Sequence, residues 1–397
     1  MVLHSSVRDG ALAGRAAAFA VTVLFAVNGA LVGGIGGTLP ALRTRLGVDV
    51  DGVSLLLFCF AGSAVASMQL AGRLADRRGA RSVALVSTPL LAGGVLLLAF
   101  AESLPVAVTA VLVAGFGNGA MDVAMNALGV QVEQARPRPI MSFFHAFFSV
   151  GNLAGAGAVV LLSQLPGLGG ARVVLPALLT IGGLSLAWYA AVVRIVPRTA
   201  PVPHLRDGVR TGLPPVAWLL GAMAFSIGLT EGTAVDWSSI HVTDVAGIDP
   251  GRGALGLVAV AGCMVVIRLY GDRFVAAYGR QRVVRSGAVL AFAGYVLAVT
   301  AEPLPLLLVG WALVGLGVGI IFPQVYAAAG HAGGGRMLAV VVTFGYAAFL
   351  IGPAITGALV SWWGIQPAMT LPLLLCVVVV ALARALPRND SAAAGRQ

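Results

Sequence analysis

Apolar residues occur along this chain in twelve long blocks, separated by short segments that carry most of the charged and turn-forming residues. The blocks cover residues 16–39, 51–71, 82–101, 104–130, 140–163, 171–193, 214–242, 253–270, 283–301, 304–328, 337–360 and 364–383. An α-helix rises about 1.5 Å per residue, so about 20 apolar residues are enough to cross the hydrocarbon core of a bilayer. The pattern therefore predicts an all-α polytopic membrane protein with twelve transmembrane helices.

The composition supports this fold class, since 59% of the residues are hydrophobic and only 10% are charged. Such a balance leaves too little polar surface for a soluble domain. The net charge of +10 could suggest nucleic acid as a partner, but the arginines follow the connections between blocks instead of forming a basic face. Nucleic acid is therefore not an expected partner.

The basic residues are divided unequally between the two sides of the predicted membrane. One side carries Arg43, Arg45, Arg172 and Arg252, and the other 21 of the 25 basic residues lie in or beside the termini and the even-numbered connections. By the positive-inside rule, both termini are expected in the cytoplasm. The first block is longer than the apolar core of a secretory signal and has no small-residue cleavage site, so we expect it to be retained.

A proline-rich polar segment divides the chain into halves. We expect an N-terminal six-helix bundle at 1–195, a cytoplasmic linker at 196–215, a C-terminal six-helix bundle at 216–385 and a cytoplasmic tail at 386–397. An internal repeat supports this division, because the Gly-x-Gly-x-Gly pattern at Gly115 recurs at Gly315 and the Ala-Glu-x-Leu-Pro segment at Ala101 recurs at Ala301. Repeated halves of six helices are typical of secondary transporters.

The densest cluster of charge lies between the second and third blocks and reads Gly-Arg-Leu-Ala-Asp-Arg-Arg-Gly-Ala-Arg, from Gly72 to Arg81. It resembles the cytoplasmic loop between the second and third helices of the major facilitator superfamily. The resemblance implies that Asp76 faces the amino end of the eleventh helix, near Arg336, where a carboxylate complements the helix dipole. It also implies that the loop arginines pair with acids at neighbouring helix ends, and Glu133 is the expected partner for Arg77 or Arg81.

We expect this loop and its echo in the second half to act as a conformational latch. The latch residues are Gly72, Asp76, Arg77, Gly79, Arg81 and Glu133, with Asp272 and Arg273 from the second half. When Asp272 is aligned with Asp76, four extra residues separate the two parts of the echo.

Ionisable residues inside apolar helices are costly, which makes them functional candidates. In the fourth block Asn118, Asp122 and Asn126 recur every four residues, so they share one helix face. His145 in the fifth block lies at a depth similar to that of Asn126, so Asp122 and His145 could meet across the hairpin between these helices. Such a pair is either a substrate or proton site or a structural hydrogen bond.

The seventh block carries Glu231 and Asp236. Their carboxylates face one cavity only if the helix bends near Gly232. Otherwise Asp236 lies at the outer membrane interface beside Trp237, a common position for tryptophan. Further polar candidates inside the blocks are Asn28, Ser149, Asn152, Gln324 and Tyr346, of which Asn28, Gln324 and Tyr346 are expected near the bilayer midplane.

The residue pattern predicts neither a metal site nor a cofactor. Cys59, Cys263 and Cys376 lie within apolar blocks and lack the spacing of metal ligands or disulfides. The chain contains no lysine, so it cannot complete a phosphate-binding loop of the nucleotide-hydrolysing type. A proton gradient is therefore the expected source of energy.

Together, the polar positions of the fourth, fifth and seventh blocks resemble a poorly characterised bacterial branch of major facilitator permeases. The resemblance implies a secondary active transporter that moves a small solute across the bacterial cytoplasmic membrane by alternating access. We expect a monomer in the lipid bilayer, with the solute and protons as partners and no enzymatic activity. The alternatives are a drug efflux antiporter, which usually has an arginine in the fourth helix, an intramembrane enzyme, and a solute sensor without transport.

Overall fold

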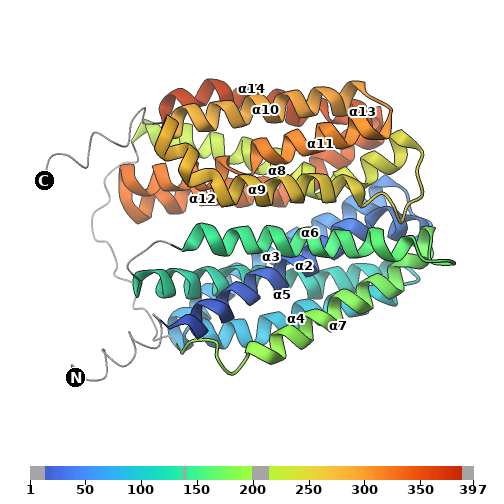
Figure 1. Ribbon diagram of the computed structural model, residues 1–397, viewed down its shortest axis with the longest axis horizontal. Helices are drawn as coiled ribbons and strands as arrows, with labels where there is room; N and C mark the ends of the chain where they lie inside the picture. The colour runs from blue at the N-terminus through green and yellow to red at the C-terminus, as the bar shows by residue number, and fades with distance from the viewer. Residues whose placement is uncertain (1–13, 137–139, 199–213, 387–397) are drawn as a thin grey trace, which may run out of the picture. The chain divides into compact units, whose positions relative to one another are not determined.

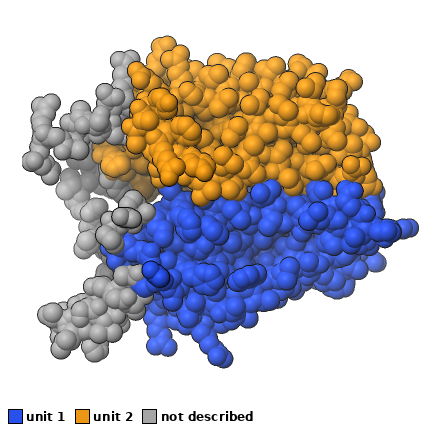
Figure 2. Space-filling model, in the orientation of Figure 1, with its two compact units in different colours: residues 1–207 blue, residues 208–397 orange. Residues whose placement is uncertain are grey.

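The computed structural model describes residues 14–136, 140–198 and 214–386, except for the side chains of residues 333–336. Within these ranges twelve helical segments are long and apolar enough to span a membrane, which confirms the predicted fold class. The chain forms two compact units, residues 1–207 (unit 1) and 208–397 (unit 2), which are coloured separately in Figure 2. Most of the predicted linker and tail, residues 199–213 and 387–397, lies outside the described residues.

Unit 1 consists of long helices and one short 3-10 turn (Figure 1). Their bounds are α2 (Arg15–Leu46), α3 (Val50–Arg78), α4 (Ala80–Ala99), α5 (Leu104–Gln134), α6 (Met141–Ser163), η1 (Gly170–Val173) and α7 (Val174–Val192). The main packing partner of α2 is α6, and α5 packs on both α3 and α4.

Unit 2 is also built from long helices, with shorter segments towards its end (Figure 1). The bounds are α8 (Pro215–Ala246), α9 (Leu255–Tyr278), α10 (Arg280–Thr300), α11 (Leu304–Val318), α12 (Ile321–Trp363), α13 (Ile365–Ala368), α14 (Thr370–Leu382) and η2 (Ala383–Ala385). The main packing partner of α8 is α12, and α11 packs on both α9 and α10.

The sequence repeat is also a repeat of helix ends, at the same offset of 200 residues. Gly47 ends α2 with φ 62° and ψ 31°, and Gly247 ends α8 with φ 61° and ψ 32°. Gly79 joins α3 to α4 with φ 83° and ψ 149°, and Gly279 joins α9 to α10 with φ 81° and ψ 150°. Glycine adopts positive φ without steric cost, so these residues end the helices at equivalent points.

The glycines of the repeated Gly-x-Gly-x-Gly pattern let helix backbones touch. A Cβ atom added to Gly117 on α5 would overlap the backbone nitrogen of Leu91 on α4. Its counterpart Gly317 on α11 has the same relation to Ala291 on α10, where the distance would be 2.5 Å. Small residues allow this close approach inside a membrane, where no hydrophobic force draws helices together.

The tenth predicted block is not one straight helix, because α11 ends at Val318 and α12 begins at Ile321. The helix assigned to α12 includes the eleventh predicted block as well, yet the rings of Phe322 and Phe349 stack with centroids 5.7 Å apart. A straight helix would separate those residues by about 40 Å. The chain therefore reverses direction between them.

Candidate functional site

Unit 2 contains a buried ion pair between α8 and α9. Glu231 is 8% exposed, and its Oε1 atom lies 2.9 Å from Nη2 of Arg268. Arg268 also donates from Nε to the carbonyl oxygen of Gly319, at 3.2 Å, where the chain breaks between α11 and α12. The second carboxylate oxygen, Oε2, is buried and has no hydrogen-bond partner among the described residues. The pair links three helices while one oxygen of Glu231 can still accept a proton or a ligand.

Arg268 is the residue of this pair that the sequence prediction missed. It lies near the end of the predicted block 253–270, where the positive-inside pattern groups it with the cytoplasmic arginines. In the structure α9 continues to Tyr278, so Arg268 is well inside the helix and its side chain is only 11% exposed. The sequence feature that could have predicted this pair is Glu231 itself. A buried carboxylate needs a cation, and Arg268 lies in the next predicted span.

The structure does not bring Glu231 and Asp236 to one helix face. The helix α8 runs without a break from Pro215 to Ala246, and five residues correspond to about 140° around its axis. Asp236 is half-buried, whereas Trp237 is 1% exposed with an indole nitrogen that has no partner in the described chain. Trp237 is therefore buried inside unit 2, and the position of Asp236 relative to the outer membrane interface stays a prediction.

Gln324 contacts the first residue of α10, and its expected position near the bilayer midplane stays a prediction. Its Oε1 atom accepts from Nε of Arg280 at 3.1 Å, and both residues are 7% exposed. Arg280 is the first residue of α10 and directly follows the turn at Gly279. Tyr346 on α12 is half-buried.

In unit 1 the predicted polar residues include three amides with buried, unpartnered oxygens. Asn28 on α2, Asn118 on α5 and Asn152 on α6 each bury an Oδ1 atom without a partner among the described residues. The amide nitrogen of Asn28 lies 3.6 Å from the sulfur of Met125 on α5. Three helices therefore contribute hydrogen-bond acceptors to the interior of this unit.

The acidic residue of the α5 stripe lies beside its neighbour on the same helix. Asn126 donates from Nδ2 to Oδ1 of Asp122, at 3.1 Å, and to the Asp122 carbonyl, at 2.8 Å. On α6 the His145 ring contacts the ring of Phe25 edge-on at 5.2 Å, and Ser149 donates to the His145 carbonyl at 3.4 Å. The functional pairing of Asp122 with His145 stays a prediction.

The structure gives two of the latch residues other partners than those expected. Oε2 of Glu133 accepts from the backbone nitrogens of Ile140 and Met141, both at 2.7 Å, and so caps the start of α6. Arg81 donates to the carbonyl oxygens of Val196, at 2.7 Å, and Val193, at 3.4 Å, beyond the end of α7. The expected pair of Glu133 with a loop arginine is replaced by two helix-end contacts.

Gly79 and Gly279 hold equivalent turns, so the four extra residues of the echo belong to the last part of α9. Asp272 therefore lies about one helical turn earlier on α9 than Asp76 does on α3. The guanidinium of the adjacent Arg273 lies 5.4 Å from the ring centroid of Tyr270. The side chain of Arg336 is outside the described residues, and the contact of Asp76 with the eleventh helix stays a prediction.

A second buried network that the sequence prediction missed surrounds His241 on α8. Its Nε2 atom lies 2.9 Å from the carbonyl oxygen of Ala298, and its Nδ1 atom accepts from the indole nitrogen of Trp311 at 3.3 Å. An indole N–H can only donate, so the proton of the neutral imidazole is on Nε2. Tyr295 packs on Trp311 and donates to the Thr230 carbonyl at 2.7 Å. This network anchors α8 to α10 and α11.

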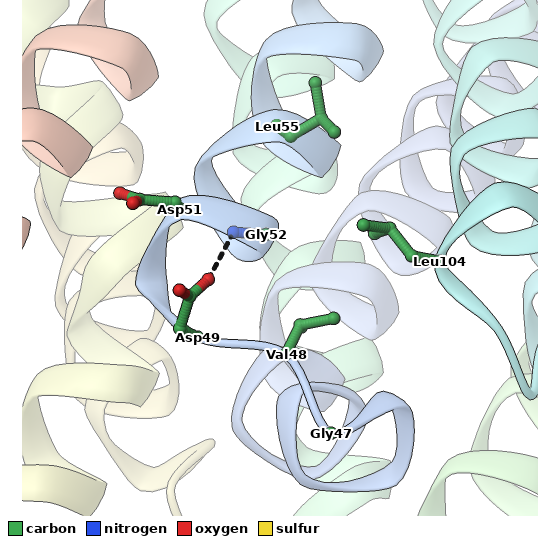
Figure 3. Close-up of a pocket in the computed structure, with 7 residues that line it drawn as sticks. All are labelled: Gly47, Val48, Asp49, Asp51, Gly52, Leu55 and Leu104. Carbon is green, nitrogen blue, oxygen red and sulfur yellow. Dashed lines mark hydrogen bonds between the residues drawn. The ribbon is translucent and has the colours of Figure 1, made fainter.

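No group of three or more histidine, cysteine, aspartate or glutamate side chains that could hold a metal occurs in the described ranges. An open depression of about 450 Å³ lies at the α2–α3 connection and includes Asp49, Asp51 and Leu104 (Figure 3). Asp49 there accepts from the Gly52 nitrogen at 3.0 Å and caps α3. This depression contains none of the predicted substrate-site residues.

Comparison with known proteins places the chain in a family. A profile of the Major Facilitator Superfamily matches residues 21–332 and 264–397. The chain belongs to this superfamily. It is 33% identical to an uncharacterised transporter, y4wD, of Sinorhizobium fredii, over 91% of this chain and 94% of that one. It is 32% identical to an uncharacterised MFS-type transporter of Yersinia pestis, over 88% and 90% of the two chains.

Another relative is the membrane protein MosC of Rhizobium meliloti, 27% identical over 94% of this chain and 90% of that protein. These relatives and the twelve apolar helices identify a multi-pass bacterial membrane protein of a poorly characterised branch, as predicted.

Solved structures of several transporters have the same fold. The nucleoside transporter NupG aligns with a TM-score of 0.71 and 14% identity, over 92% of this chain and 98% of that one. The human organic anion transporter MFSD10 aligns with a TM-score of 0.66 and 16% identity, over 93% and 99% of the two chains. The E. coli fucose:proton symporter FucP aligns with a TM-score of 0.63 and 15% identity, over 92% and 97%.

Proposed function

We propose that the protein is a proton-coupled secondary transporter that moves a small solute across the bacterial cytoplasmic membrane by alternating access. The arginine distribution supports cytoplasmic termini, and the proposed activity is transport and not catalysis. Membership of the Major Facilitator Superfamily supports the transport activity. A fucose:proton symporter among the proteins with the same fold is consistent with proton coupling.

The observation that carries the coupling proposal is the buried pair of Glu231 and Arg268. A buried ion pair is retained only when the two charges compensate each other, so protonation of the acid releases the cation. Oε2 of Glu231 has no hydrogen bond in the described chain, so a proton can bind there without first displacing Arg268 from Oε1. Arg268 would then exchange Glu231 for another acceptor, and the unit would change between two states.

Proton movement in proteoliposomes tests this proposal. The purified protein is reconstituted into lipid vesicles that enclose a pH-sensitive dye. Polyols, amino sugars, sugar acids and alkylamines are then added one at a time to the external solution. We expect at least one compound to change the internal pH in the parent protein. The Glu231→Gln variant should bind that compound but move no protons, because the amide cannot take up a proton.

Glu102→Gln is the matched control, since the side chain of Glu102 is 87% exposed at the α4–α5 connection. It should behave like the parent protein. A requirement for a sodium gradient, or unchanged proton movement in Glu231→Gln, would contradict the proposal.

A further inference from the structure

The three buried amide oxygens of unit 1 are unusual for a helical bundle. Nearly all buried polar side-chain atoms in proteins have a hydrogen-bond partner, and an acceptor without one destabilises the fold. Asn28 and Asn152 are only 2% and 5% exposed, yet the described chain supplies no donor to either oxygen. A bound ligand or a water molecule can supply the donor that the described residues do not.

The orientation of the Asn28 amide follows from the chemistry of its neighbour. Its nitrogen lies 3.6 Å from the thioether sulfur of Met125, and a thioether can accept a hydrogen bond but cannot donate one. The nitrogen must therefore face the sulfur, and Oδ1 points away from it. The Oδ1 atom of Asn28 is therefore available as an acceptor to whatever binds there.

The helices bring Asn28 and Asn152 close together. A Cβ atom added to Gly33 would lie 2.7 Å from the Cα atom of Asn152, and one added to Gly29 would lie 3.0 Å from its backbone nitrogen. Asn152 thus lies against α2 between these two glycines, within about one helical turn of Asn28.

The third amide lies on the helix that Asn28 contacts. Asn118 precedes Met125 by seven residues, about two turns, so both lie on the same face of α5. Asp122 lies between them, and the hydrogen bond from Asn126 shows that its carboxylate also acts as an acceptor. This part of unit 1 therefore presents oxygen acceptors and a carboxylate.

We infer that the amide oxygens of Asn28, Asn118 and Asn152 accept hydrogen bonds from the transported solute, which presents hydroxyl groups or a protonated amine. This inference rests on the proposed transport function and names its substrate class. A carboxylate or phosphate group on the solute has no donor to offer these oxygens, and it would be repelled by Asp122. The site selects donor-rich solutes against anions.

Binding without a pH gradient tests the substrate class separately from transport. The thermal stability of the purified protein is measured with glucose, glucosamine and gluconate. These compounds have similar size, but glucose is uncharged, glucosamine carries an ammonium group and gluconate carries a carboxylate. Hexitols, inositols and alkylamines complete the panel. Sodium chloride is tested by itself as a control for salt. Ligands that bind the folded state raise its stability. We expect hydroxylated or amino compounds to stabilise the protein and sugar acids to have no effect.

Two kinds of variant link binding to the amides. Asn28→Leu and Asn152→Leu remove the acceptor and should weaken binding of the stabilising compound at least tenfold. Asn28→Asp and Asn152→Asp keep the shape and the acceptor, so they should retain binding of an amine or tighten it. Thr38→Val is the control, because Thr38 is buried on the same helix but donates to its own helix, to the Gly34 carbonyl at 2.9 Å. It should bind like the parent protein.

Several outcomes would overturn the inference. Stabilisation by sugar acids alone, by sodium chloride alone or by no compound of the panel would do so, as would parent-like binding in the Leu variants. If those variants fail to fold, loss of amine binding in the Asp variants would count equally against it. Proton-coupled transport of an anionic solute would leave the proposed function standing, whereas donor-dependent binding without proton movement would contradict only the coupling.

Discussion

The two units share one plan of helix ends, but they differ in how their first and fifth helices meet. In unit 1 backbones touch, because a Cβ atom added to Gly151 on α6 would overlap the Ala26 carbonyl oxygen on α2. In unit 2 the equivalent position is looser, since a Cβ atom added to Gly352 on α12 would lie 3.8 Å from Leu229. The closest backbone approach there is at Gly228, where an added Cβ atom would lie 3.0 Å from the Gly345 carbonyl oxygen. The repeat has kept the turns while the packing between these helices has changed.

The buried polar groups also differ between the two units. Unit 2 buries a full ion pair, Glu231 with Arg268, whereas the buried acceptors of unit 1 include neutral amides such as Asn28. Charge needs a partner on a second helix at a defined distance, and amides need only donors from a ligand or water. If both proposals hold, one backbone frame carries a switching site in one half and a recognition site in the other.

The largest effect on stability is expected from breaking the ion pair of unit 2. Arg268→Ala leaves Glu231 buried without its cation and should lower the free energy of unfolding by about 3 kcal/mol or more. The double variant Glu231→Gln with Arg268→Met should recover most of that loss, because partners in one interaction are not additive. Thermal denaturation in detergent is measured for the parent protein, Arg268→Ala, the single variants Glu231→Gln and Arg268→Met, and the double variant. A double variant as unstable as the sum of both single changes would show that the pair is not one unit.

A somewhat smaller loss of stability is expected at the α2–α6 contact of unit 1, and it should exceed the loss at the α8–α12 contact of unit 2. Gly151→Ala forces α2 and α6 apart and should cost about 2 kcal/mol, as overpacking does in tight interiors. Gly352→Ala should change stability by less than about 1 kcal/mol, because its methyl group makes an ordinary contact. Gly157→Ala on α6 is the control for helix propensity, since nothing lies within 4 Å of an added Cβ atom there. Equal losses in Gly151→Ala and Gly352→Ala would remove the proposed difference between the units.

The smallest effect on stability, below about 1 kcal/mol, is expected from Asp122→Asn and His145→Gln in unit 1, both of which are half-buried. Their effect on transport should nevertheless be strong. If the two residues act as one unit, each change should reduce the transport rate severely and the double variant should be little slower than either. Rates in proteoliposomes decide this, and independent losses would direct attention to Glu231.

The sequence by itself determined the number of membrane spans, because each needs about 20 apolar residues and the charges fall between them. It also determined the repeat, since glycines such as Gly79 and Gly279 recur where the chain must turn with positive φ. It identified Asn28, Asp122 and Glu231 as candidates, because polar groups inside an apolar span are costly wherever the helix packs. These features depend on local composition and spacing.

Only the tertiary structure decided which groups meet. The partner of Glu231 depends on the rotation and depth of α9 against α8, and a residue count cannot fix the position of Arg268 to within a hydrogen bond. Glu133 similarly caps α6 instead of pairing with a loop arginine, because free backbone nitrogens at a helix start compete for the same carboxylate. Contacts between helices result from packing distances of a few ångströms, to which the hydrophobic pattern of the chain is insensitive.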